Sequence, residues 1–174
     1  MDHLSDRVAI LGLGNTILSD DGLGILAAQA LSRRLADEPV TVLDLCWGGF
    51  SLLDALEGFD WVIVLDVICT GQCPPGTIQQ WIAPEFCPSQ RIVSQHDMGF
   101  FTALEFGRRL GLRMPRRVSL FTVEALDIET VSETLTPAVE AALEPLVESV
   151  MDTLRRSGAL RASRQLATLA GAGI

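Results

Sequence analysis

Three polar residues of the chain have types and positions that could bind a metal ion: Asp21, Asp66 and His96. Asp66 stands in the otherwise apolar run 61–68, where a carboxylate is costly to desolvate unless it is paired or bound to a metal. His96 is one of only two histidines in the chain and directly precedes a predicted helix. Two carboxylates and one imidazole suit a borderline transition metal such as zinc or nickel, with positions left open for another partner.

Taken one at a time, the same motifs have ordinary structural explanations. Asp20 is expected to cap the first helix, which leaves Asp21 unexplained by capping. The pair Gly12 and Gly14 could form a tight turn, and the third glycine of a dinucleotide-binding fingerprint is missing, because Ile17 occupies its position. A lone histidine such as His96 is more often a surface or capping residue than a ligand.

The order of predicted elements brings these residues to one place. Apolar periodicity predicts strands over 7–13, 40–45, 61–67 and 117–123, an extended segment over 76–82, and helices over 22–35, 51–56, 97–110 and from Thr136 onwards. Alternating strands and helices predict an α/β fold of three αβα layers, with a twisted, mostly parallel sheet of about five strands flanked by helices. Ligands of such sheets bind at the carboxyl ends of the strands, where Asp21, Asp66 and His96 should converge.

Length and charge restrict the function further. The 174 residues suit a single domain, predicted over 1–158, followed by a C-terminal tail over 159–174 whose periodicity is weak and which is expected to be frayed or disordered. A net charge of −9, with 13 basic against 22 acidic residues, disfavours binding to nucleic acid. No run approaches the roughly 20 apolar residues of a membrane span, and residues 1–10 lack the layout of a signal peptide. We therefore expect a cytoplasmic protein that binds neither nucleic acid nor membrane and is a monomer.

An ordered series of motifs resembles one known family. The motifs are GLGNTILSDDGLG at 12–24, VLD at 42–44, VIVLDVI at 62–68, PPGT at 74–77, SQHDMG at 94–99 and LTPAVEAALEPLVE at 135–148. Together they resemble the hydrogenase maturation proteases, which are the endopeptidases that process the C-terminus of NiFe hydrogenase large subunits. The resemblance runs from about residue 8 to residue 154, nearly the whole predicted domain.

The resemblance implies a function and a set of site residues. It implies an endopeptidase that removes the C-terminal extension of a NiFe hydrogenase large-subunit precursor after nickel insertion. By motif position, Asp21, Asp66 and His96 correspond to the family's metal-binding and catalytic residues, and Asp44 to an acid that supports the cleft. The nickel would come with the precursor, and no organic cofactor is implied. Some members have Gly-Gly-Thr where this chain has 45–47, so this loop is expected to shape which precursor is accepted.

Several alternatives remain at this point. The nickel could polarise the scissile carbonyl, or a carboxylate could activate water while the nickel serves recognition only. The protein could instead be a non-catalytic, nickel-sensing chaperone that uses the same residues. Peptidyl-tRNA hydrolases also begin with a strand that runs into Gly-Leu-Gly-Asn, but they continue with Pro-Gly where this chain has Thr16-Ile17, and they need a basic groove. A dinucleotide-binding domain is the weakest alternative.

Overall fold

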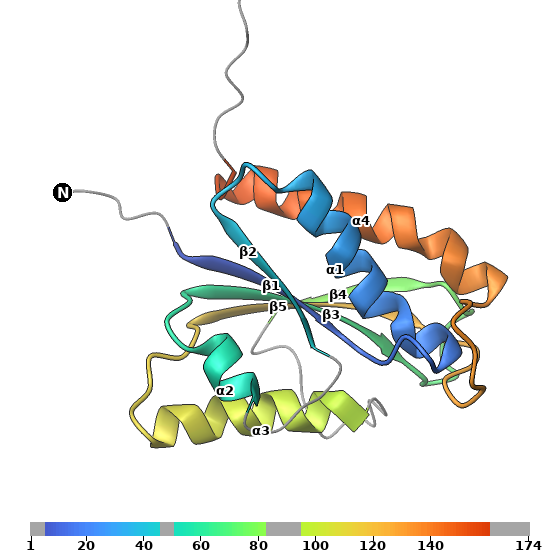
Figure 1. Cartoon of the computed structure of the whole chain (residues 1–174), viewed down its shortest axis with the longest axis horizontal. Coiled ribbons are helices and arrows are strands. Elements are labelled where there is room, and N and C mark those ends of the chain that lie inside the picture. The colour runs from blue at the N-terminus through green and yellow to red at the C-terminus, as the bar shows by residue number, and fades with distance from the viewer. Residues whose placement is uncertain (1–5, 46–50, 83–94, 161–174) are drawn as a thin grey trace, which may run out of the picture.

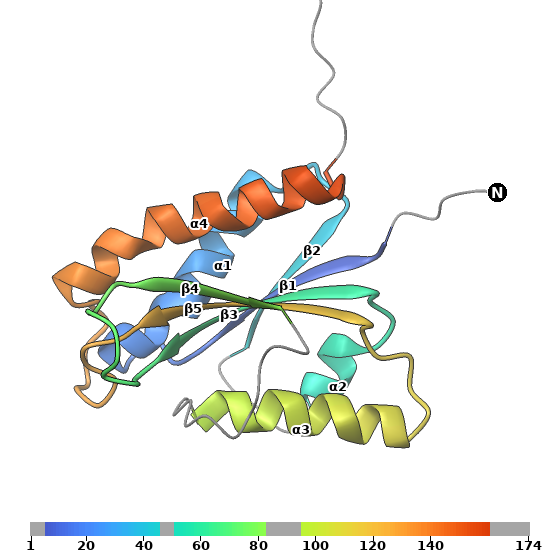
Figure 2. The same cartoon turned by 180° about the vertical axis from the view of Figure 1, so that it is seen from behind.

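A computed structural model of the chain describes residues 6–45, 51–82 and 95–160. Within these ranges one sheet is formed by the strands β1 (Val8–Leu13), β2 (Val40–Leu45), β3 (Trp61–Ile68), β4 (Ile78–Ile82) and β5 (Arg117–Glu124). The helices are the 3-10 helix η1 (Ser19–Gly22) and the α-helices α1 (Leu23–Arg34), α2 (Ser51–Leu56), α3 (Gln95–Arg109) and α4 (Pro137–Ser157). Helices α1 and α4 cover one face of the sheet, and α2 and α3 cover the other (Figures 1 and 2). The predicted three-layer α/β architecture is confirmed.

The strand order places a topological switch point beside β1. The order is β2-β1-β3-β5-β4; the first four strands of this order are parallel to their neighbours, and β4 is antiparallel to β5. After β1 the chain forms β2 on one side of it and then crosses to form β3 on the other side. Connections that diverge in this way leave a crevice at the carboxyl ends of the strands, which is where open α/β sheets bind their ligands.

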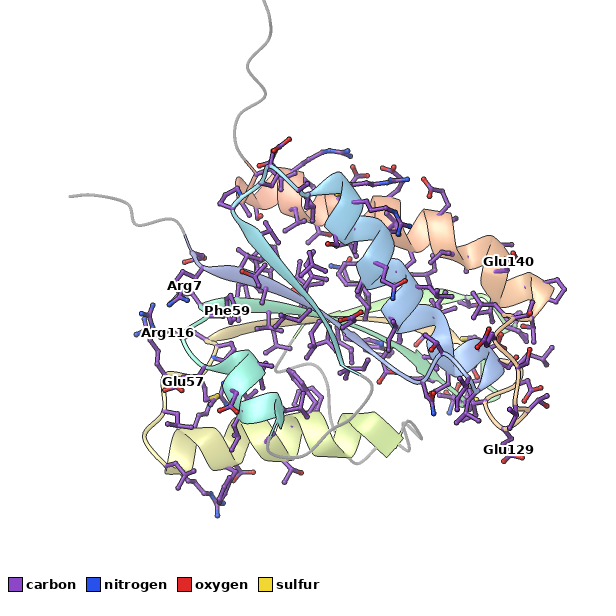
Figure 3. All side chains as sticks on the ribbon, viewed as in Figure 1. Arg7, Glu57, Phe59, Arg116, Glu129 and Glu140 are labelled. Atoms are coloured by element: carbon purple, nitrogen blue, oxygen red, sulfur yellow. The ribbon has the colours of Figure 1, made fainter. Side chains whose placement is uncertain are left out.

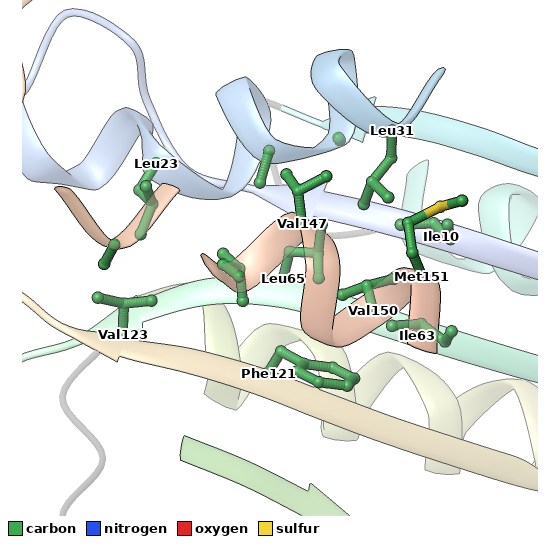
Figure 4. Packing of buried hydrophobic residues seen from close by; sticks show 14 of the residues in the cluster. Ile10, Leu23, Leu31, Ile63, Leu65, Phe121, Val123, Val147, Val150 and Met151 are labelled. Carbon is green, nitrogen blue, oxygen red and sulfur yellow. The ribbon is translucent and has the colours of Figure 1, made fainter. Parts of the chain in front are cut away.

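Two separate hydrophobic clusters hold the layers together. Side chains alternate between the two faces of a strand, so Ile63, Leu65 and Val67 of β3 pack with α1 and α4, as Figure 4 shows for the first two. Val62 and Val64 of the same strand belong to the second cluster, with α2 and α3. All eight residues of β3 are buried, as expected for the central strand of a parallel sheet covered on both faces.

Glycines allow α1 to lie unusually close to the sheet. A Cβ added at Gly24 would lie 2.2 Å from the carbonyl oxygen of Leu13 and 2.5 Å from that of Leu65, and one added at Gly12 would lie 2.4 Å from the carbonyl oxygen of Gly24. Real Cβ atoms do not approach backbone this closely, so these two positions admit only glycine. The glycines of the first motif therefore serve helix-to-strand packing.

The observed boundaries differ from the predicted ones by a few residues. The first α-helix begins at Leu23 and is preceded by η1, β3 continues to Ile68, and β5 continues to Glu124. Thr136 is the N-cap residue of α4 as predicted, with a proline at the start of the helix. The division into a domain over 1–158 and a tail over 159–174 stays a prediction, since residues 161–174 lie outside the described ranges. Of the helices that are described, none is both long enough and apolar enough to span a lipid bilayer.

Candidate functional site at the carboxyl ends of the strands

Asp21 lies in the short connection between β1 and α1. It belongs to η1, and its side chain is buried. The connection turns sharply: Gly14 has a φ of +138°, and a Cβ added there would lie 1.9 Å from the carbonyl oxygen of Asp21. The backbone N–H of Asn15 donates to the same oxygen at 3.2 Å. The turn residues therefore fix the backbone of Asp21 directly after β1.

Asp20 does not cap the first helix, and that prediction is wrong. The N-cap position of α1 is Gly22, with no side-chain hydrogen bond. The fully buried carboxylate of Asp20 instead accepts hydrogen bonds from the backbone N–H groups of Leu126 (2.9 Å), Asp127 (3.0 Å) and Thr136 (2.7 Å). It also accepts one from the Thr136 hydroxyl at 2.9 Å. Asp20 thus joins the β1–α1 connection to the loop between β5 and α4, and buried backbone donors need such partners.

Asp66 is a fully buried carboxylate near the carboxyl end of β3. One of its oxygens, Oδ1, accepts a hydrogen bond from the backbone N–H of Val67 at 2.8 Å. By strand alternation it faces α2 and α3, like Val62 and Val64. In β5 the residue paired with Asp66 is Thr122, also buried, whose hydroxyl accepts a hydrogen bond from the Trp81 indole at 3.2 Å. The face toward α3 therefore changes from apolar to polar at its carboxyl end.

His96 lies in the first turn of α3, and its side chain is outside the described part of the structure. The end of α3 that contains this turn lies on the same side of the molecule as the carboxyl ends of β3 and β5 (Figures 1 and 2). Among the described residues, no group of three or more His, Cys, Asp or Glu side chains could hold a metal ion. The metal-binding set of Asp21, Asp66 and His96 therefore stays a prediction.

Asp44, expected to support the cleft, is an exposed residue near the carboxyl end of β2, opposite Gly12 in the sheet. Its supporting role stays a prediction. The loop segment 46–50, which follows it and was expected to shape precursor choice, lies outside the described residues.

Glu124 is a buried acid that the sequence analysis missed. It ends β5, and its Oε1 accepts hydrogen bonds from the backbone N–H groups of Thr70 and Gly71, each at 2.7 Å. Its Oε2 accepts one from the Thr70 hydroxyl, also at 2.7 Å. Glu124 therefore fixes the connection that follows β3 and Asp66. A carboxylate near the end of an otherwise apolar run was the signal that singled out Asp66, and it would have found Glu124 as well.

The pKa of the Cys69 thiol reflects the negative charge at the carboxyl ends of the strands. Burial raises the pKa of Cys69 above its ordinary value, and the negative charges of Glu124, Asp20, Asp21 and Asp127 raise it further. A raised pKa keeps the sulfur protonated at neutral pH, and the thiol is a much poorer nucleophile than the thiolate. Nucleophilic catalysis by Cys69 is therefore disfavoured.

The fold and these side chains define an α/β protein with buried carboxylates gathered beside the switch point of its sheet. The profile of the HycI hydrogenase maturation protease family matches residues 25–153. The chain belongs to the hydrogenase maturation protease family, and the resemblance found in its motifs is confirmed.

Individual relatives agree with this assignment. The chain is 33% identical over 128 residues to the hydrogenase expression/formation protein HupD of Bradyrhizobium diazoefficiens, covering 71% of this chain and 65% of that protein. It is 32% identical over 120 residues to the hydrogenase 2 maturation protease of Escherichia coli K12, covering 67% of this chain and 72% of that protein. The chain thus spans slightly less than two thirds of the length of the first HupD relatives it matches, 65% of one and 61% of another.

Solved structures show the same fold. The hydrogenase maturating endopeptidase HybD from E. coli superimposes with a TM-score of 0.75 at 30% identity, covering 89% of this chain and 98% of that one.

Proposed function

We propose that this protein is an endopeptidase that removes the C-terminal extension of a NiFe hydrogenase large-subunit precursor after nickel has been inserted. The observation that carries the proposal is the pair of buried acids Asp21 and Asp66, held at neighbouring strand ends in a chain of the hydrogenase maturation protease family. Nickel belongs to the substrate in this proposal, and the precursor is the partner.

The proposed site would recognise the nickel of the precursor through two carboxylates and one imidazole. Asp21 and Asp66 supply the carboxylates and His96, in the first turn of α3, supplies the imidazole; this donor set suits a borderline divalent metal. Asp20 and Glu124 would act at a distance from the metal: their hydrogen bonds hold the connections in which Asp21 lies and which follow Asp66. A rigid support of this kind keeps ligands in a productive geometry.

The chemical step is hydrolysis of one peptide bond beside the bound nickel. Water adds to the carbonyl carbon, the C–N bond breaks, and the leaving amine takes up a proton. Either the substrate's nickel polarises the carbonyl, or one carboxylate of the site accepts the proton of the attacking water. The low-dielectric surroundings of Asp66 would strengthen both effects.

Mass spectrometry of the precursor tests the proposal. The full chain is incubated with nickel-loaded and with nickel-free precursor, and we expect a short C-terminal peptide to be lost only from the loaded form. His96→Ala should abolish this loss while circular dichroism shows an unchanged fold. If a folded His96→Ala protein processed the precursor normally, His96 would be excluded from the site. Complex formation without any change in mass would favour a nickel-sensing chaperone instead.

A further inference from the structure

Three large apolar side chains are exposed next to the candidate site. Ile17 is 50% exposed, Leu126 63% and Val131 79%; we call these three residues the loop patch. Ile17 precedes η1, and the other two lie in the loop between β5 and α4. Single exposed apolar residues are common, but three in neighbouring loops beside a candidate site are more than scattered exposure requires.

Hydrogen bonds join the two loops that present the loop patch. The backbone N–H of Ser132 donates to the carbonyl oxygen of Ile17 at 3.0 Å, and that of Ser19 donates to the carbonyl oxygen of Ser132 at 2.8 Å. The N–H of Leu126 donates to the buried carboxylate of Asp20 at 2.9 Å. The Asp20 carboxylate, which holds the connection that contains Asp21, therefore also holds Leu126, and a partner that docks on the patch would lie beside the candidate site.

The described basic residues all lie away from the carboxyl ends of the strands, whereas acidic residues occur at both ends of the molecule. The described part of the chain contains ten arginines. They precede β1, lie in the loop before β5 or at its first residue, or occupy the last turns of α1, α3 and α4. They are Arg7, Arg33, Arg34, Arg108, Arg109, Arg113, Arg116, Arg117, Arg155 and Arg156. The described loops at the carboxyl ends of the strands contain no basic residue, and the exposed acids Glu129 and Glu133 lie on either side of Val131. Figure 3 shows Glu129 and Glu140 at one end of the molecule and Arg7 and Arg116 at the other.

We propose that the loop patch is the surface on which the large-subunit precursor docks, through an apolar surface of the precursor that is flanked by lysine or arginine side chains. This inference rests on the proposed function. The apolar side chains supply contact area, and the acids around them favour a basic partner and disfavour an acidic one. The position of the patch beside Asp21 would bring the precursor's nickel to the site as docking occurs.

The apolar part of the proposal is tested by single-turnover processing of nickel-loaded precursor with the full chain in excess. For Leu126→Ser/Val131→Ser we expect the half-saturating enzyme concentration to rise about tenfold, with the maximal rate within about twofold of the wild-type rate. Leu110→Ser is the matched control, since Leu110 is 57% exposed but follows the last turn of α3 at the arginine-rich end. Leu110→Ser should change neither the half-saturating enzyme concentration nor the maximal rate.

The charged part is tested by charge reversal. Glu129→Lys/Glu133→Lys should raise the half-saturating concentration about fivefold at low ionic strength, and the difference from wild type should shrink at about 0.5 M salt. Glu57→Lys reverses an exposed acid at the arginine-rich end (Figure 3) and should have little effect. Equal half-saturation in wild-type and patch variants, with processing intact, would overturn the docking surface alone. Absence of processing by the wild-type chain would overturn the proposed function, and the docking surface with it.

Discussion

The two faces of the sheet differ at their carboxyl ends, although the same strands form both. On the face covered by α1 and α4, β3 contributes Ile63, Leu65 and Val67, so this face is apolar to the end of the strand. On the face covered by α2 and α3, Val62 and Val64 are followed by the buried acid Asp66. Strand β5 repeats the pattern, with Phe121 and Val123 on the first face and Leu120, Thr122 and Glu124 on the second.

This difference indicates that the face covered by α1 and α4 mainly stabilises the fold, while the face covered by α2 and α3 carries the buried acids. The α1 side is closed by backbone-to-backbone contact at Gly12 and Gly24, which leaves no room for a ligand. Burying carboxylates on the α3 side costs free energy. Apolar residues in their place would stabilise the fold at least as well. Buried acids at a strand end are therefore better explained by function than by stability.

The largest effect is expected when adjacent residues of β3 are changed separately. Asp66→Asn keeps the shape of the side chain and an oxygen that can accept from the Val67 N–H, but it removes the charge. We expect processing of nickel-loaded precursor to fall at least about 100-fold, with the free energy of unfolding changed by less than about 1 kcal/mol. Val67→Ala should do the reverse: the free energy of unfolding falls by about 2 kcal/mol and processing continues.

Urea unfolding and single-turnover processing of the two variants measure this contrast. If Asp66→Asn processed precursor at the wild-type rate, the assignment of activity to the α3 face and of stability to the α1 face would be refuted. A comparable loss of activity in folded Val67→Ala would refute it as well.

An effect of similar size is expected when the close contact between α1 and the sheet is filled, but here the whole effect falls on the free energy of unfolding. Gly24→Ala places a methyl group against the carbonyl oxygens of Leu13 and Leu65, so backbone must move. We expect the free energy of unfolding to fall by about 3 kcal/mol. Gly111→Ala is the control: nothing lies within 4 Å of an added Cβ, and only its φ of +75° opposes the change, at about 1 kcal/mol. Similar unfolding midpoints for the two variants would show that α1 is not packed this tightly.

The smallest predicted effect concerns the negative charges around Cys69 at the carboxyl ends of the strands. Because Glu124 helps to raise the pKa of Cys69, Glu124→Gln should lower that pKa and increase the thiolate fraction at pH 8. In a chain whose other cysteines, Cys46, Cys73 and Cys87, are replaced by serine, we expect alkylation of Cys69 to become about threefold faster. The midpoint of the alkylation rate against pH should lie above that of an unperturbed cysteine thiol in the parent and move downward in the variant. A rate unchanged by Glu124→Gln would mean that the charge of Glu124 does not contribute to the raised pKa of Cys69.

Sequence reasoning predicted most of the fold because the strands are short apolar runs separated by turn residues. It also selected Asp66, since a carboxylate within such a run stands out. The mistake at Asp20 arose from the local rule for helix caps, which cannot detect an acceptor whose donors lie 106 to 116 residues away. Glu124 carries the same sequence signal at the end of its apolar run, but the hydrogen-bond donors that it holds follow another strand, so this role became visible only when β3 and β5 were placed side by side.

The hydrogen bonds of Asp20 also determine when the candidate site can be completed during synthesis. Asp20 and Asp21 emerge early, but the donors to Asp20 are Leu126, Asp127 and Thr136, and Thr136 immediately precedes the last helix. A nascent chain that ends before β5 has no partners for this carboxylate, and contacts so distant in sequence form late in folding. The connection that contains Asp21 therefore reaches its final arrangement only after nearly all of the described fold has been translated, so the site is absent from partly synthesised chains.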